Sequence, residues 1–90
     1  LDLAPRRITV NAVAPGWVDS ALAEQTFEAL AAHTGTLPGI IRQSAIAASP
    51  LGRLVAIEEV AQLVLFLASP AAAGITAQVY GVDTGQSLAV

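Results

Sequence analysis

Two β-prone segments near opposite ends of the chain limit the folds that this sequence can adopt. The first, ITVNAVAP (residues 8–15), is almost continuously apolar, and the second, ITAQVYGVD (residues 75–83), alternates between two sets of side chains. Mostly helical sequence separates them. Strands joined by so long a crossover are parallel, and helices cover both faces of a parallel sheet. The sequence therefore predicts an α/β fold with a buried parallel sheet.

Two strands are too few for such a sheet, which needs several neighbouring strands. The charge content agrees, because only 12% of the residues are charged while 54% are hydrophobic. In an average soluble domain about a quarter of the residues are charged. We therefore expect residues 1–90 to be the C-terminal part of a single larger domain, with the missing strands upstream of Leu1.

Composition also excludes several classes of function. The net charge of −3 and the absence of lysine argue against a nucleic-acid partner, because phosphate binding needs clustered basic side chains. With no cysteine and one histidine, the chain has no disulfide framework and no predicted metal site. The longest apolar stretch, residues 60–68, is about half as long as a bilayer span. We expect a cytoplasmic protein with no membrane partner.

The segment between the two strands predicts three helices, at residues 21–33, 40–48 and 56–69. Four apolar residues of the first helix fall on roughly one side: Leu22, Phe27, Leu30 and Ala31. The third helix is apolar nearly all round its axis, which predicts burial on several sides. Residues 1–7 are interpreted as the last turn of a further helix, which Pro5 ends.

The block NAVAPGWVDS (residues 11–20) is the strongest candidate for a binding site. In open parallel sheets, ligands bind beyond the carboxyl ends of the strands. A strand that ends at Pro15 and Gly16 delivers the next residues to that place. The glycine lets the backbone approach a ligand closely, and the proline fixes the turn. Taken alone, the dipeptide Pro-Gly more often only ends a strand.

Three blocks carry a resemblance to a known family: residues 7–20, 50–69 and 75–86. In this order and spacing they resemble the C-terminal portion of classical short-chain dehydrogenases/reductases, including 3-oxoacyl carrier-protein reductases and 3-hydroxybutyrate dehydrogenases. The first block is the most specific. It departs from the family form Asn-x-x-x-Pro-Gly-x-(Val/Ile)-x-Thr only at Ser20, which retains a hydroxyl group.

The resemblance implies a Rossmann-like doubly wound parallel sheet, of which this chain supplies two strands and helices, with the N-terminal nucleotide-binding half absent. It implies an enzyme that uses NAD or NADP to interconvert a small-molecule carbonyl and a secondary alcohol by hydride transfer. When complete, the protein would be a homo-oligomer, either a dimer or a tetramer. The family's catalytic serine, tyrosine and lysine and its glycine-rich loop match no position here. We therefore predict no catalytic residue in this chain, and no activity for these 90 residues alone.

By the same resemblance, the predicted cofactor-binding residues are Pro15, Gly16, Val18 and Ser20. The main chain at Val18 would meet the nicotinamide carboxamide, and Ser20 would hydrogen-bond the carboxamide or the pyrophosphate. Residues 21–49 would form a lid on the substrate side. Trp17 and Leu22 are its candidate substrate contacts, although Trp17 could equally anchor the lid and Leu22 could simply pack within it.

Other conspicuous residues have structural interpretations. Tyr80 lacks the family's lysine four positions later, where Thr84 stands, so we predict a core or interface residue. We expect Arg53 to brace a loop or pair with a carboxylate, and Asn11 to be a hydrogen-bonded amide. Ala77 and Thr84 each replace a glycine common in the family, which puts the C-terminal geometry in question. The alternative function is that of an inactive fragment that acts only in subunit association.

Overall fold

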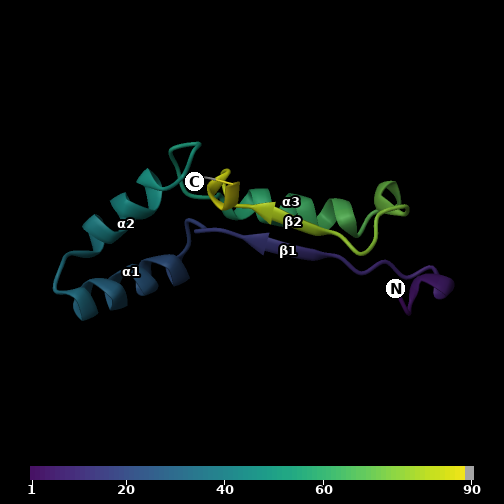
Figure 1. Cartoon of the computed structure of the whole chain (residues 1–90), viewed down its shortest axis with the longest axis horizontal. Helices are drawn as coiled ribbons and strands as arrows, with labels where there is room; N and C mark the ends of the chain where they lie inside the picture. Colours follow the sequence, from purple (N-terminus) through teal and green to yellow (C-terminus); the bar gives the residue numbers. More distant parts are fainter. Residues whose placement is uncertain (89–90) are drawn as a thin grey trace.

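Two parallel strands form the centre of the computed structural model, which describes residues 1–88 (Figure 1). Strand β1 (Ala12–Pro15) pairs with β2 (Val79–Val82), with Ala12 opposite Val79 and Pro15 opposite Val82. The chain between them contains three α-helices, α1 (Ala21–Thr34), α2 (Pro38–Ala47) and α3 (Ile57–Leu67). This order confirms the predicted α/β class and the parallel pairing of the two segments.

Both strands are shorter than predicted. In the residues just before each strand, side chains take the place of main-chain groups in the hydrogen bonds between the two segments. The N–H of Val10 donates to Thr76 Oγ1 at 3.0 Å. The amide of Asn11 donates to the carbonyl of Ile75 and accepts from the N–H of Gln78, each at 3.1 Å. Ala77 has a left-handed φ of 60°, which interrupts the extended conformation. Asn11 is therefore the hydrogen-bonded amide that the sequence predicted.

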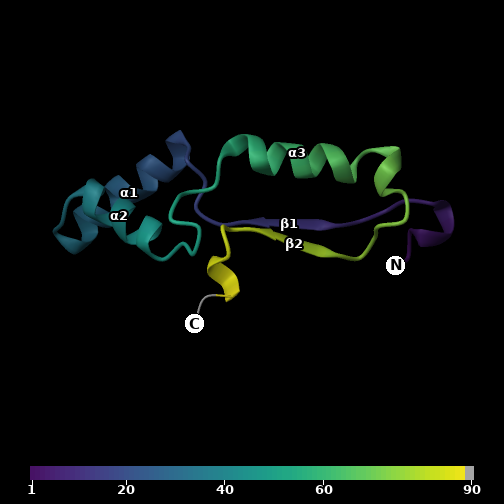
Figure 2. The same cartoon turned by 90° about the horizontal axis from the view of Figure 1, so that it is seen from above.

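The core of the chain lies between α1 and α2, which pack side by side beyond the carboxyl ends of the strands (Figures 1 and 2). Its buried members are Ala23, Phe27, Ala45 and Leu54, and Trp17, Ile41 and Ile46 pack against them. Helix α1 ends at Gly35, whose φ of 74° favours glycine and whose N–H caps the carbonyl of Ala31. We call α1, α2 and their connection the helical hairpin.

The buried face of α1 differs in part from the predicted one. Ala23, Phe27 and Ala31 recur every four residues and are at most 5% exposed. Leu22 and Leu30, by contrast, are 72% and 39% exposed. Phe27 and Ala31 pack as their shared side suggested, whereas Leu30 is partly exposed and Leu22 does not pack within the segment, because α2 covers a narrower strip of α1 than its apolar residues occupy.

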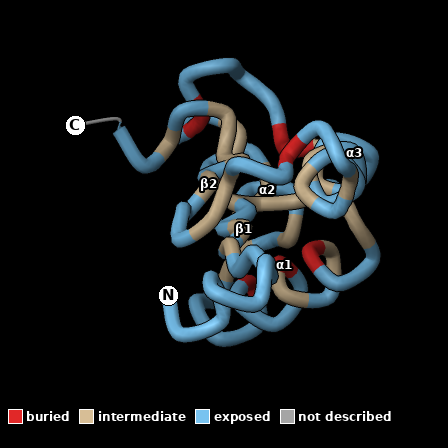
Figure 3. Tube along the Cα trace, turned by 90° about the vertical axis from the view of Figure 1, so that its right-hand side faces the viewer, coloured by how far each residue is buried: buried red, intermediate tan, exposed pale blue. Residues whose placement is uncertain are grey.

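Helix α3 lies along one face of the two strands (Figure 2). It contains no buried residue within the described part of the chain, and Ile57, Val64, Leu65 and Phe66 are 45–62% exposed. Most of α3 and of the strands has the exposed or intermediate colour in Figure 3. The sequence predicted that the strands and several sides of α3 would be buried, and the described residues do not bury them. One helix can cover only one face of a sheet.

The start of the chain corrects a smaller expectation. Residues Ala4–Arg6 form a short 3-10 helix, η1, in which Pro5 lies inside the turn and does not end it. Proline fits the first turn of a helix because its missing N–H is not needed there. Two further 3-10 turns are η2 (Pro70–Ala72) and η3 (Gln86–Leu88). Among residues 1–88, no helix is long and apolar enough to cross a membrane.

Candidate functional site

The carboxyl ends of β1 and β2 approach each other closely at Gly16. Its N–H donates to the carbonyl of Val82 at 2.9 Å. A Cβ atom on Gly16 would lie 2.9 Å from Cβ and 3.0 Å from Cα of Asp83. Sequence reasoning assigned this glycine to close approach by a ligand. The structure adds that the close approach of Asp83 already requires a residue without a Cβ atom at this position.

The chain after Gly16 pairs with the segment that leads into α3. The N–H of Val55 donates to the carbonyl of Trp17, and the N–H of Asp19 donates to the carbonyl of Val55, both at 2.8 Å. Successive peptide groups of an extended chain point to opposite sides, so the N–H and C=O of Val18 point away from Val55. Within residues 1–88, no hydrogen bond engages the N–H of Val18. This main-chain donor is available to a ligand.

Ser20 begins helix α1. Its Oγ accepts a hydrogen bond from the N–H of Ala23 at 3.2 Å and donates to the carbonyl of Val18 at 3.3 Å. A serine in this position satisfies one of the free N–H groups of the first helical turn. The sequence analysis did not foresee this capping role. Ser20 therefore places the positive end of the α1 dipole beside Val18.

One cavity of ≈ 260 Å³ brings together all six residues that the sequence assigned to cofactor or substrate: Pro15, Gly16, Trp17, Val18, Ser20 and Leu22. Ala23 and Thr26 complete its wall. Thr26 was missed, although it follows Leu22 by one helical turn and so shares its face of α1. The hydroxyl of Thr26 donates to the carbonyl of Leu22 at 2.9 Å and retains lone pairs to accept a further hydrogen bond.

Trp17 has the anchoring role that the sequence offered as one alternative, and its contact with a substrate stays a prediction. Its ring lies 4.9 Å from that of Phe27, centroid to centroid, with an interplanar angle of 44°. This contact joins the tryptophan to the core of the helical hairpin. Trp17 also forms part of the cavity wall, so it anchors α1 and faces the space beside it. Leu22 is exposed at the same cavity and takes no part in the core.

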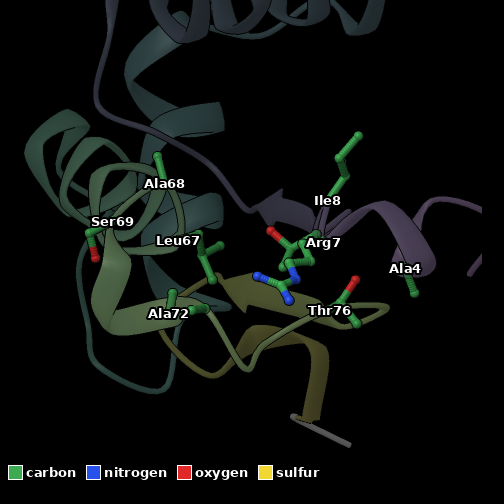
Figure 4. A pocket seen from close by; sticks show the side chains of 10 residues that line it. Ala4, Arg7, Ile8, Leu67, Ala68, Ser69, Ala72 and Thr76 are labelled. Atoms are coloured by element: carbon green, nitrogen blue, oxygen red, sulfur yellow. The ribbon is translucent and has the colours of Figure 1, made fainter.

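A larger cavity lies elsewhere, at the amino ends of the strands. It measures ≈ 490 Å³, and Arg7, Leu67 and Thr76 are among its lining residues. Figure 4 shows the guanidinium group of Arg7 between the side chains of Leu67 and Thr76. None of the predicted site residues lines it. Because ligands of open parallel sheets bind at the carboxyl ends, the smaller cavity is the better candidate site.

Two arginines brace the elements around the site. Arg42 of α2 donates to Glu24 of α1 at 2.7 Å and to Asp19 at 3.4 Å, which ties the helical hairpin to the strand end. Arg53 makes two hydrogen bonds to the carboxylate of Glu59 at the start of α3. Arg53, together with the N–H of Ala56, lowers the pKa of Glu59 to about 2. The predicted pairing of Arg53 with a carboxylate is confirmed.

The chemistry available in this chain is that of binding and orientation. Tyr80 is half-buried on β2, away from the cavity wall. Among the described residues, no group of three or more histidine, cysteine, aspartate or glutamate side chains could hold a metal ion. The cavity offers a main-chain N–H, two hydroxyl groups and apolar surface. Such a site can hold a flat polar ring in one orientation.

The parallel strands, the helix on their face and the cavity beyond their carboxyl ends define part of a Rossmann-like α/β fold. Comparison with known proteins makes this more specific, because residues 1–87 match the family described as enoyl-(acyl carrier protein) reductase. The chain belongs to the classical short-chain dehydrogenases/reductases, a family of oxidoreductases. The resemblance carried by the three sequence blocks is thereby confirmed.

Individual relatives agree. The 3-oxoacyl-(acyl-carrier-protein) reductase FabG of Thermotoga maritima is 43% identical over 84 residues, which are 93% of this chain and 30% of that protein. The FabG of Pseudomonas aeruginosa is 39% identical over 93% of this chain and 30% of its own length.

Solved structures show the same relation. A short chain dehydrogenase family protein from Francisella tularensis superposes with a TM-score of 0.88 and 31% identity, over 97% of this chain and 36% of its own. A variant of actinorhodin polyketide ketoreductase with NADPH gives a TM-score of 0.85 and 38% identity, over 94% and 33%. The chain thus spans about a third of the length of its relatives.

Proposed function

We propose that this chain is a segment of an NAD- or NADP-dependent oxidoreductase that interconverts a carbonyl and a secondary alcohol by hydride transfer. The free N–H of Val18, beside the hydroxyl of Ser20 in a cavity at the carboxyl end of β1, is the observation that carries the proposal. The ketoreductase structure with NADPH and the FabG reductases support it, since each acts in that chemical class by its name.

The residues present fit the nicotinamide end of such a cofactor. A carboxamide has a carbonyl that can accept from the N–H of Val18 and an amide that can donate to Val18 or Ser20 oxygen atoms. The positive end of the α1 dipole beside Ser20 also suits an anionic phosphate. When bound, the cofactor supplies the hydride that the reaction transfers. Pro15 and Gly16 fix the chain that carries these groups.

The helical hairpin and the two residues that follow it, residues 21–49, would form the lid on the substrate side. Leu22 and Thr26 present an apolar surface and one hydroxyl to the cavity, as suits a small carbonyl or alcohol substrate. A lid of this kind excludes water from the reacting atoms. In this proposal the acid or base and the glycine-rich loop belong to the rest of the domain, in a cytoplasmic homo-oligomer.

The sharpest test of the cofactor assignment is Ser20→Ala in the complete protein. Loss of one neutral hydrogen bond should weaken binding by about 0.5–1.5 kcal/mol. Loss of the helix cap should lower the free energy of unfolding by about 1 kcal/mol. We expect NADPH titration by fluorescence to show a raised Kd, and denaturant unfolding to show the second effect. Ser20→Thr is the matched control, because it retains the hydroxyl group.

The two effects can be separated. If Ser20→Ala unfolds more easily but binds NADH and NADPH with unchanged affinity, Ser20 is only a helix cap and the cofactor contact is wrong. If the wild-type protein binds neither nucleotide, the proposed function itself fails.

A second candidate function is subunit association without catalysis. It is favoured by the apolar side chains of α3 and by Val79 of β2, which is 73% exposed. The first candidate makes a prediction about the isolated 90 residues. We expect this piece to show no dehydrogenase activity with NADH or NADPH and to aggregate, because its apolar surfaces and strand edges need the rest of the domain. A soluble, cooperatively unfolding monomer would contradict this expectation in sedimentation and thermal unfolding experiments.

A further inference from the structure

The turn after β2 is joined to the end of the helical hairpin through two hydroxyl groups. Ser49 Oγ and Thr84 Oγ1 lie 2.5 Å apart, and Thr84 Oγ1 donates to the carbonyl of Asp83. Thr84 has one hydroxyl proton, so Ser49 must be the donor between them. Ser49 in turn accepts from the N–H of Arg53 at 3.4 Å. The four groups form one chain of hydrogen bonds with a single direction.

The surrounding backbone supports the same connection. The N–H of Leu51 donates to the carbonyl of Thr84 at 3.2 Å. A Cβ on Gly85 would lie 3.2 Å from the ring of Pro50, so the turn and the loop are closely packed. Ser49 is only 8% exposed and is the one buried polar residue among residues 1–88. Its hydroxyl proton therefore depends on Thr84 for an acceptor.

Thr84 holds an unfavourable backbone conformation. Its φ is 57°, in the left-handed region that β-branched residues avoid. Such conformations persist only where surrounding interactions hold them. Here the contacts to Ser49 and Leu51 are those interactions. The side chain of Thr84 thus offsets a backbone cost that a glycine in its place would not have.

This connection lies next to the candidate site. Asp83, whose carbonyl ends the chain of hydrogen bonds, is the residue that approaches Gly16. Ser49 is the last residue of the segment 21–49, whose first turn lines the cavity. The pair therefore links the far end of that segment to the strand ends that carry Gly16.

We propose that Thr84 is a positioning residue, and that its hydrogen bond to Ser49 is a latch that holds the end of segment 21–49 against the strand ends. The latch sets the position of the wall formed by α1, and so the KM for the carbonyl substrate. The effect on KM depends on the proposed function, whereas the coupling between Ser49 and Thr84 does not.

The test is a double-mutant cycle in the complete protein, with Thr84→Val, Ser49→Ala and the double variant. Hydrogen exchange at the N–H groups of Leu51 and Arg53 reports the latch directly. We expect each single variant to raise exchange there about threefold or more, as for loss of one neutral hydrogen bond. The double variant should add little to the larger single effect, because both remove the same interaction. Additive effects, or unchanged exchange, would overturn the latch.

Kinetics supply the second measurement, with NADPH and a 3-oxobutanoyl thioester as probes. We expect Thr84→Val to raise the KM for the thioester about threefold or more with a smaller change in kcat. Thr84→Ser should restore KM, because it keeps the hydroxyl group. A threefold or larger fall in kcat with an unchanged KM would contradict the positioning role.

Two further variants separate the latch from general stability. Thr84→Gly removes the hydroxyl group but relieves the left-handed backbone, so it should open the latch without lowering the melting temperature. Ser69→Ala is the control, because the Ser69 hydroxyl donates to the carbonyl of Phe66, three residues earlier and outside segment 21–49. It should leave exchange at Leu51 and KM unchanged. If the wild-type protein binds no nicotinamide nucleotide, the proposed function fails and the exchange cycle alone decides on the latch.

Discussion

Gly16→Val in the complete protein is expected to abolish measurable cofactor binding and to destabilise the fold. Any side chain at this position begins with a Cβ that would lie 2.9 Å from Cβ and 3.0 Å from Cα of Asp83. A backbone atom cannot rotate away as a flexible side chain can. The ends of β1 and β2 must therefore separate, at an overpacking cost of about 1–3 kcal/mol. The same movement would displace Val18 and Ser20, which we propose as contacts of the nicotinamide.

Denaturant unfolding and NADPH titration measure the two effects in one protein. Gly16→Ala should also lower the stability and the affinity for NADPH, since it places the same Cβ atom against Asp83. The matched control is Gly39→Ala in α2, where no atom lies within 4 Å of the added Cβ. This control should bind NADPH normally and be slightly more stable, because alanine favours helix. Normal stability and affinity in Gly16→Val would show that the strand ends tolerate a wider separation.

Phe27→Ala should cause the largest loss of stability of any single truncation in the helical hairpin. Phe27 is fully buried and stacks against Trp17. Removal of a buried phenylalanine costs about 3–5 kcal/mol. Because most residues of this core belong to the helical hairpin, the loss should be largely local. Hydrogen exchange should rise across residues 21–49 and much less in β1 and β2.

Leu30→Ala in the same helix is the control for this prediction. Leu30 is 39% exposed whereas Phe27 is fully buried, so truncation of Leu30 removes less buried surface and should cost less. If Phe27→Ala raises exchange equally in the strands and in residues 21–49, the hairpin does not fold as a separate unit. If the two variants are equally stable, the core described here is wrong.

Sequence reasoning succeeded where the signal was local. The apolar run before Pro15 and the helical periodicity after Ser20 are each contained in one segment. The helix formed where expected, and the strand formed in the second half of its run. The six predicted site residues share a cavity largely because they lie close together in the sequence, at positions 15–22.

What escaped prediction depends on residues distant in the sequence. No local pattern reveals that Asp83 approaches Gly16 or that Thr84 meets Ser49. The burial expected for α3 failed for a related reason. Apolar side chains show which residues would pack, but a single-segment pattern does not say where their partners lie.

The two departures from the family's glycines have a physical explanation in the backbone. Ala77 and Thr84 both have left-handed φ values, of 60° and 57°. Glycine adopts this region freely, whereas residues with a Cβ do so at a cost. The resemblance identified these positions as unusual, and their conformation shows why the substitution matters there. Only Thr84 has a side-chain hydroxyl that can offset the cost.

The pairing of Val18 with Val55 means that the chain leaves the strand layer and returns to it at nearly the same point. The segment between these residues is a long connection whose two ends stay fixed whatever its length. The entropy cost of lengthening such a connection grows only slowly. Insertions, deletions or a wholesale exchange of this part can therefore change the shape of the adjoining cavity without moving β1 or β2. Evolution can remodel what the site accepts here while leaving the frame that holds it intact.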